Sequence, residues 1–299
     1  MRWKDSYHPY AALTIVCWSM AFVFTRLALK SFDVYALGLL RYLAASIVAA
    51  AVAVAVRMPW PAWRDVPLFL ISGATGFGLY MIVFNLGNST VSAATGAVML
   101  ATAPIITAVI ARIFLGERLR GVQYAAIFVS FSGVVVLTVL RGGFRADGGI
   151  GFLLLAALLI SLYNLLQRRL TRDYSPLHAT LISIFFGTAM LLPFAPGAVR
   201  QAAAAPPEAF FYVAMLGVFS SVIAYIAWGQ ALKIAPNASA VSNYMFITPF
   251  LTTLLGLWLA GEPLEASTLA GGLLIIAGLV VFRFGDRLLR RAAHRRAIH

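Results

Sequence analysis

Two stretches of the sequence decide the fold: PIITAVIARIFLGE at residues 104–117 and PFLTTLLGLWLAGE at residues 249–262. Each begins with a proline, continues through an apolar run and ends in Gly-Glu, and the second begins 145 residues after the first. Outward from them, the same separation relates Gly133 to Gly278. Further matches form a gap-free run over residues 80–137, so the pattern predicts an internal duplication of the chain.

The composition indicates a chain that lies in a membrane. Hydrophobic residues make up 62% of its 299 residues and charged residues only 11%. A soluble domain has roughly 45–50% apolar and about 25% charged residues. Because there is too little polar surface to cover a soluble fold, the excess apolar surface must face lipid.

Ten apolar segments are long enough to cross a bilayer, which takes about 20 helical residues. They are much longer than transmembrane strands and show no alternation of period two. We therefore expect an all-α integral membrane fold with ten transmembrane helices. These are expected at residues 9–30, 34–56, 66–86, 91–114, 121–140, 149–169, 176–195, 209–232, 237–259 and 266–285.

The basic residues predict the orientation. With the N-terminus in the cytoplasm, 17 Lys and Arg residues fall in inner segments and five in outer segments. The positive-inside rule then places both termini in the cytoplasm, with residues 286–299 as a basic cytoplasmic tail. The net charge of +13 does not indicate nucleic-acid binding, because the basic residues form short clusters between apolar runs. Membrane lipids are the expected partner of these clusters.

The duplication gives residues 1–299 the organisation of a single membrane domain with two five-helix repeats, 9–140 and 149–285. Because five is odd, the second repeat must enter the membrane from the opposite side. Inverted repeats are typical of secondary transporters, which bind their solute near the midplane between the repeats.

The duplicated proline and Gly-Glu pattern, together with a tryptophan early in the first helix, resembles the drug/metabolite transporter superfamily and its EamA repeats. Within that superfamily, the chain is most similar to bacterial metabolite exporters, including the YddG-type exporters of aromatic amino acids. The resemblance implies a secondary transporter that exports small organic metabolites across the bacterial inner membrane by alternating access. A multidrug or other metabolite carrier of the same fold, a channel and a membrane-bound lipid enzyme remain alternatives.

Pro104 and Pro249 are expected to bend their helices. Proline lacks the backbone donor that a helix interior requires, and in lipid the freed carbonyl must find another partner. We interpret both prolines as hinge or cavity-shaping residues; a tolerated structural kink is the alternative.

Trp18 and Tyr163, Tyr80 and Tyr225, and Met99 and Tyr244 occupy equivalent positions of the two repeats, and amides such as Asn243 are expected at membrane depth. Equivalent positions can line one shared cavity, and aromatic walls with a few amides suit an amphipathic or aromatic solute. Each residue taken alone is more simply explained by helix packing. The predicted substrate-binding set is Trp18, Tyr80, Met99, Tyr163, Tyr225, Asn243 and Tyr244.

Arg41 is the one basic residue predicted well inside a helix. Burial of a charge in the membrane is expensive, so it is a candidate partner for a substrate carboxylate. The alternative is a structural role near the outer surface. Glu117 and Glu262 are expected at helix ends, and the lack of a midplane carboxylate favours facilitated diffusion over proton coupling.

Other kinds of chemistry have no support in the sequence. It contains neither a HExxH motif nor a cysteine pair, so we expect no metal, and no GxxxxGK[ST] motif, so the chain is not itself an ATP-driven pump. We expect no cofactor and no catalytic residue. A monomer is plausible.

Overall fold

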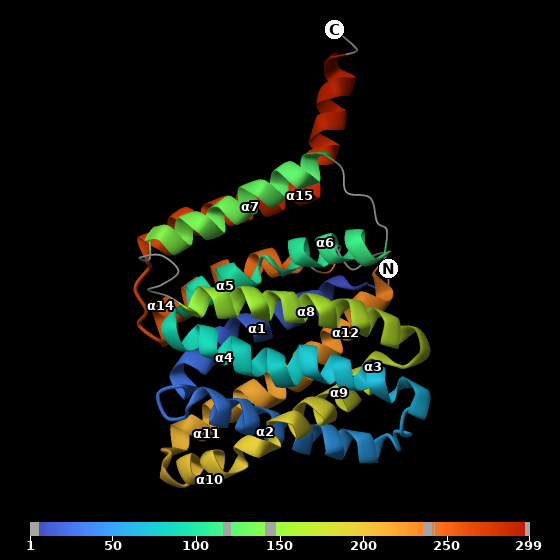
Figure 1. Cartoon of the computed structure of the whole chain (residues 1–299), viewed down its shortest axis with the longest axis vertical. Helices are drawn as coiled ribbons and strands as arrows, with labels where there is room; N and C mark the ends of the chain where they lie inside the picture. Colours follow the sequence, from blue (N-terminus) through green and yellow to red (C-terminus); the bar gives the residue numbers. More distant parts are fainter. Residues whose placement is uncertain (1–5, 116–120, 141–147, 236–240, 242, 297–299) are drawn as a thin grey trace.

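The computed structural model describes residues 6–115, 121–140, 148–235, 241 and 243–296, and these residues form helices and no strand. The first half contains α1 (His8–Ala28), α2 (Val34–Ala55), η2 (Trp63–Asp65), α3 (Val66–Gly73), η3 (Ala74–Gly78), α4 (Leu79–Thr90), α5 (Ala93–Leu100), α6 (Ala103–Leu115) and α7 (Gly121–Leu140). The second contains α8 (Gly148–Asp173), α9 (Pro176–Leu191), η4 (Leu192–Phe194), α10 (Ala195–Ala204), α11 (Pro207–Ala214), η5 (Met215–Ile223), α12 (Ala224–Ile234), η6 (Asn243–Ile247), α14 (Thr248–Leu259) and α15 (Ala266–Arg296). Figure 1 shows these helices packed as one bundle.

Seven helical stretches of the described residues are long and apolar enough to cross a membrane. They are His8–Ala28, Val34–Ala55, Trp63–Thr90, Ala93–Ile110, Gly148–Asp173, Pro176–Ala204 and Pro207–Ile234. Three shorter apolar helices, Gly121–Val136, Thr248–Leu259 and Ala266–Gly278, lie within the remaining expected segments. The last helix runs past the expected end at residue 285, and Figure 1 shows its C-terminal part projecting beyond the bundle.

The helix ends follow local rules. Asp33 caps α2, because its side chain accepts hydrogen bonds from the backbone N–H groups of Tyr35 and Ala36 at 3.0 and 2.7 Å. Ser92 caps α5 in the same way. These two caps define where α2 and α5 begin.

The sequence predicted that Pro104 and Pro249 lie inside continuous helices. The structure corrects this prediction. The chain makes a turn at residues 101–102, and α6 then begins at Ala103, so Pro104 stands in its first turn. Pro249 likewise occupies the first turn of α14, after the 3-10 segment η6. A proline fits there because the N–H groups of a first helical turn have no partner in the helix. Both halves thus interrupt the helix just before the proline.

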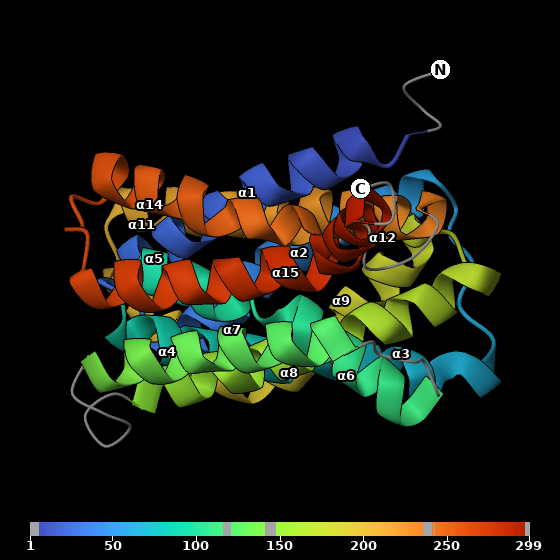
Figure 2. The ribbon, with the colours of Figure 1, turned by 90° about the horizontal axis from the view of Figure 1, so that it is seen from above.

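Helices α7 and α15 form a pair on one side of the bundle, and they run side by side in opposite directions (Figures 1 and 2). Their contacts are reciprocal. A Cβ atom on Gly133 would lie 2.7 Å from the backbone N of Ile275, and one on Gly278 would lie 2.7 Å from the backbone N of Ser130. Ser130 and Ile275 are 145 residues apart, as are the two glycines, and Ser130 Oγ donates to the Ile275 carbonyl at 3.2 Å. Reciprocal contacts of this kind are typical of an interface on a twofold axis.

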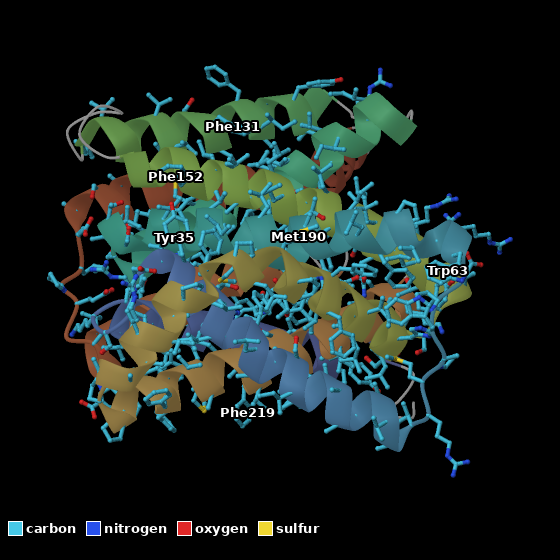
Figure 3. All side chains as sticks on the ribbon, turned by 60° about the horizontal axis from the view of Figure 1, so that its bottom comes forward. Tyr35, Trp63, Phe131, Phe152, Met190 and Phe219 are labelled. Atoms are coloured by element: carbon cyan, nitrogen blue, oxygen red, sulfur yellow. The ribbon has the colours of Figure 1, made fainter. Side chains whose placement is uncertain are left out.

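Large apolar side chains cover the outside of the bundle. Trp258 is 81% exposed, and Leu254 and Leu273 are each 64% exposed. Figure 3 shows outward-directed side chains such as Phe152, Met190 and Phe219 over the length of the helices, with Trp63 at one end. An apolar surface of this extent suits hydrocarbon rather than water.

Candidate solute cavity

A cavity lies inside the bundle where helices of both halves meet. It is bounded by residues of α1, α2, α4, α5, α8, α12, η6 and α14 and by the turn that follows α5. Its volume is ≈ 40 Å³, which is room for a few water molecules. The lining residues are Trp18, Ala21, Phe22, Arg41, Tyr80, Phe84, Ala97, Leu100, Ala101, Ile160, Tyr225, Met245 and Thr248.

A π-helical segment precedes each of two cavity tyrosines. Segment η3 ends at Gly78, just before Tyr80, and η5 ends at Ile223, just before Tyr225. The two segments end 145 residues apart, at equivalent positions of the two halves. A π-bulge leaves backbone carbonyls free for other donors and occurs often at functional sites. Here Tyr225 Oη donates to the carbonyl of Gly76 within η3 at 3.3 Å.

Aromatic rings form much of the wall. The Trp18 ring lies 5.2 Å from that of Tyr225, and the Phe84 ring lies 5.5 Å from Tyr80 and 5.3 Å from Phe22, measured between centroids. Trp18 Nε1 donates to the carbonyl of Ser220 at 3.3 Å, so its polar edge is satisfied by η5. Such a wall offers ring faces to an apolar group or a cation.

Arg41 is the one charged side chain among the described residues that line the cavity, and it is 3% exposed. Its Nε donates to Ser221 Oγ at 2.8 Å, and its guanidinium carbon lies 5.7 Å from the ring centre of Tyr42. A weak contact joins Nη1 to Met81 Sδ at 3.8 Å. Within the part of the chain that the structure describes, Arg41 forms no ion pair. A buried cation without a counter-charge favours an anion beside it.

Four of the sequence-predicted residues come together at this cavity: Trp18, Tyr80, Tyr225 and Arg41. Tyr163 stands one layer behind them, because it packs against Tyr225 with the ring centres 5.5 Å apart and covers Gly76. It supports the wall and is not part of its lining.

The structure places Met99 and Tyr244 elsewhere. Met99 is fully buried in the core, and Tyr244 forms a hydrogen bond with His8 near the start of α1. Instead, the residues that follow each of them, Leu100 and Met245, line the cavity. Successive residues of a helix point about 100° apart around its axis. The distance in sequence from a proline was therefore not enough to predict which residue faces the cavity.

The remaining predicted residues are Asn243, Pro104 and Pro249. The side chain of Asn243 lies outside the described part of the structure. Pro104 is not among the residues that line the cavity, and Pro249 borders a separate apolar groove between α14 and α15. The residues that line the cavity are Ala101 and Thr248, which come shortly before the two prolines, and not the prolines themselves.

Several lining residues were not in the predicted set, and three of them, Leu100, Met245 and Phe84, carried a signal in the sequence. Leu100 and Met245 are 145 residues apart, so the repeat itself marks them as a pair. Phe84 lies one helical turn after Tyr80 and shares its face. Ile160 and Thr248 had no signal of this kind, because ordinary apolar and small polar residues are common throughout the chain.

Long apolar helices around an internal cavity with aromatic walls indicate a multi-pass membrane protein. The model of the EamA-like transporter family matches the chain twice, over residues 6–139 and 147–284. The chain belongs to this family of membrane transporters.

Relatives span nearly the whole chain. It is 32% identical over 269 residues to a probable terminal-alkyne amino-acid exporter of Streptantibioticus cattleyicolor, covering 90% of each chain. It is 30% identical over 270 residues to the uncharacterized transporter YdfC of Bacillus subtilis, covering 90% of this chain and 88% of the relative. A crystal structure of another protein shares the fold with a TM-score of 0.61 at 21% identity, covering 92% of this chain and 96% of the other.

Proposed function

We propose that the protein exports amino acids or similar small carboxylate-bearing solutes across the bacterial inner membrane. In this proposal ten transmembrane helices form two inverted five-helix repeats, which alternately open the cavity to each side. The proposal is carried by Arg41, which lies buried on the cavity wall and forms no ion pair with any of the described residues. The amino-acid exporter among the relatives supports the same class of solute.

The cavity supports this solute class through the two kinds of group on its wall. The Arg41 guanidinium suits a carboxylate, because planar charge-assisted hydrogen bonds fit that geometry. Trp18 and Tyr225 present aromatic surface that suits an ammonium group or an apolar side chain. The cavity must widen to admit a solute, since ligand pockets usually measure about 300–1,000 Å³. An exporter that alternates between conformations provides that widening.

Several observations favour inverted repeats. The family match occurs once in each half of the chain. Equivalent helices α7 and α15 run antiparallel with reciprocal contacts at Gly133 and Gly278. The π-helical segments η3 and η5 recur at equivalent positions. An antiparallel relation of equivalent helices is expected when one half is turned over in the membrane.

The direct test is counterflow in proteoliposomes over a panel of amino acids. A carrier loaded with unlabelled solute on one side should accumulate labelled solute transiently, and its flux should saturate. Flux that rises linearly with concentration and shows no counterflow would indicate a channel. Counterflow with neutral amines but with no carboxylate in the panel would overturn the assigned solute class.

The distribution of basic residues allows a prediction about membrane topology. Reporter fusions at Met1 and at His299 should both give cytoplasmic signals, because the inner segments carry 17 Lys and Arg residues against five outside. A periplasmic signal from either fusion would mean that the number of membrane crossings or the assigned orientation is wrong.

The residues that line the cavity allow a prediction about energy coupling. Because Arg41 is the one charged side chain among the described lining residues, we expect net transport down a solute gradient without a pH difference. Flux should be unchanged when a protonophore collapses an imposed pH gradient at a constant membrane potential. Stoichiometric proton movement with each solute would contradict this expectation.

A further inference from the structure

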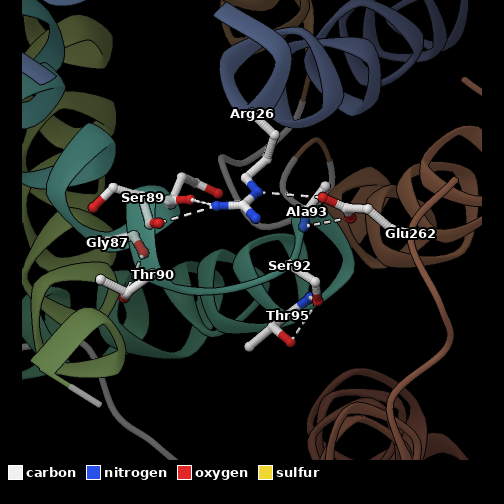
Figure 4. A network of polar contacts seen from close by, with 9 residues as sticks. Arg26, Gly87, Ser89, Thr90, Ser92, Ala93, Thr95 and Glu262 are labelled. Carbon is white, nitrogen blue, oxygen red and sulfur yellow. Dashed lines mark hydrogen bonds and ion pairs between the residues drawn. The ribbon is translucent and has the colours of Figure 1, made fainter. Parts of the chain in front are cut away.

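A polar network ties α1 to both halves of the bundle at one end of the cavity (Figure 4). Arg26 Nε donates to Glu262 Oε1 at 3.3 Å, and Arg26 Nη1 donates to the carbonyls of Asn88 and Ser89 at 2.9 and 3.0 Å. Glu262 Oε2 accepts from the backbone N–H of Ala93 at 2.9 Å. The network therefore joins the ends of α1, α4 and α5 to the link between α14 and α15.

The backbone of that link forms a tight turn that positions Glu262. Gly261 has a φ of +62°, a conformation that residues with a Cβ adopt at a cost. This turn brings the backbone N–H of Glu262 to the carbonyl of Gly256 at 3.1 Å, back on α14. From this turn the Glu262 carboxylate reaches across to Arg26 and Ala93 in the first half of the chain.

The network lies one helical turn from the cavity. Each of three helices supplies a cavity residue and, four residues further toward the same end, a member of the network. These pairs are Phe22 and Arg26 in α1, Phe84 and Asn88 in α4, and Ala97 and Ala93 in α5. Four residues of an α-helix advance about 6 Å, so the network and the Phe22–Phe84 ring contact form the end wall of the cavity.

A second pocket lies on the other side of this wall. Its volume is ≈ 490 Å³, which is within the range of solute sites. It contains two cationic and two acidic side chains. The lining residues are Arg26, Leu27, Leu29, Lys30, Phe32, Asp33, Val34, Ser89, Ala260, Gly261, Glu262 and Pro263.

We propose that this second pocket is the exit vestibule of the exporter and a second carboxylate site. The Arg26–Glu262 ion pair closes the cavity, and the solute carboxylate replaces Glu262 on Arg26 as the solute leaves. This inference rests on the proposed export of a carboxylate-bearing solute. With the N-terminus in the cytoplasm, α1 ends at the outer surface, so the vestibule opens outward.

The exposure of the pair suits a closure that breaks in every cycle. The side chains of Arg26 and Glu262 are 32% and 16% exposed, and ion pairs that water reaches are weak. When Glu262 leaves, Arg26 keeps its two carbonyl partners, so the guanidinium stays in place to receive another carboxylate. The solute would then pass from one arginine, Arg41, to the next.

The closure is tested by the reactivity of a cysteine in the cavity. In a Cys17→Ser background, Ala97→Cys should react slowly with a small membrane-impermeant thiol reagent added outside. Arg26→Gln or Glu262→Gln should each raise the rate about fivefold, as expected for loss of a contact of this kind. The double variant should be no faster than either single variant, because the two side chains act through one contact.

Matched controls separate closure from general loosening. Arg200→Gln removes an exposed cation from α10 and should leave the rate unchanged. Ala204→Cys, on the exposed surface, measures the intrinsic reactivity of the reagent in each variant. Unchanged labelling in both single variants, or independent multiplication of their effects in the double variant, would overturn the closure.

The carboxylate site is tested with acetate in place of chloride at equal ionic strength outside. Acetate should speed labelling of Ala97→Cys when Arg26 and Glu262 are both present, and should have no effect in Arg26→Gln. An equal acceleration in Arg26→Gln, or none in the intact pair, would overturn the exchange at Arg26. Neither readout needs the transported solute, so a failure here is distinguishable from failure of the Arg41 site, which is measured by flux.

Discussion

Replacing Arg41 with glutamine should raise the half-saturating concentration for counterflow of a carboxylate-bearing solute about thirtyfold or more. Removing one partner of a buried charge pair typically costs about 2–5 kcal/mol, and each 1.4 kcal/mol is about tenfold in affinity. Arg41 is 3% exposed and forms no ion pair within the described residues, so the solute would supply its counter-charge. Counterflow in proteoliposomes measures the loss as a rise in the half-saturating concentration.

The stability of the same variant distinguishes binding from a structural role. An unpaired buried charge is itself destabilising, so Arg41→Gln should unfold in detergent at the same temperature as the parent or higher. Arg41→Lys should retain part of the flux, because it keeps the charge and loses the planar donor geometry. The surface control Arg200→Gln should transport normally. Full flux in Arg41→Gln, or a lowered unfolding temperature that accounts for its loss, would remove Arg41 from the site.

Replacing Gly278 with valine should separate or distort the α7–α15 pair and abolish most transport. A Cβ there would lie 2.7 Å from the carbonyl of Ala126 and the backbone N of Ser130. Backbone atoms of a helix cannot move aside cheaply, and overpacking costs about 1–3 kcal/mol or more. Thermal unfolding in detergent, followed by size-exclusion chromatography, should show a clear fall in the midpoint.

Gly133, the repeat equivalent of Gly278, allows a second test of the same contact, and Gly151 allows a control. Gly133→Val should have a comparable effect, since its Cβ would meet Ile275 on the partner helix at the same distance. Gly151→Val in α8 should be tolerated, because no atom outside its own stretch of helix lies within 4 Å of a Cβ there. Equal stability of Gly278→Val and Gly151→Val would mean that α7 and α15 do not pack through these glycines.

Part of the candidate site could be predicted from the repeat, and the rest depended on helix rotation. The separation of 145 residues singled out Tyr80 and Tyr225, and both line the cavity. The same reasoning selected Met99 and Tyr244, but the adjacent Leu100 and Met245 face the cavity instead. The turn at residues 101–102 and the 3-10 segment η6 change how these side chains are oriented relative to the prolines that follow, and periodicity alone does not reveal such interruptions.

The amino-acid sequence by itself determined that this chain is helical, lies in a membrane and is duplicated. Those properties depend on the length of apolar runs, on charge and on a constant separation, all of which are local or one-dimensional quantities. Tertiary structure alone decided that Arg41 meets Ser221 across 180 residues and that Arg26 meets Glu262 across 236. Such contacts depend on how helices rotate and pack against one another, which is set by the shapes of all their side chains together and not by any single segment.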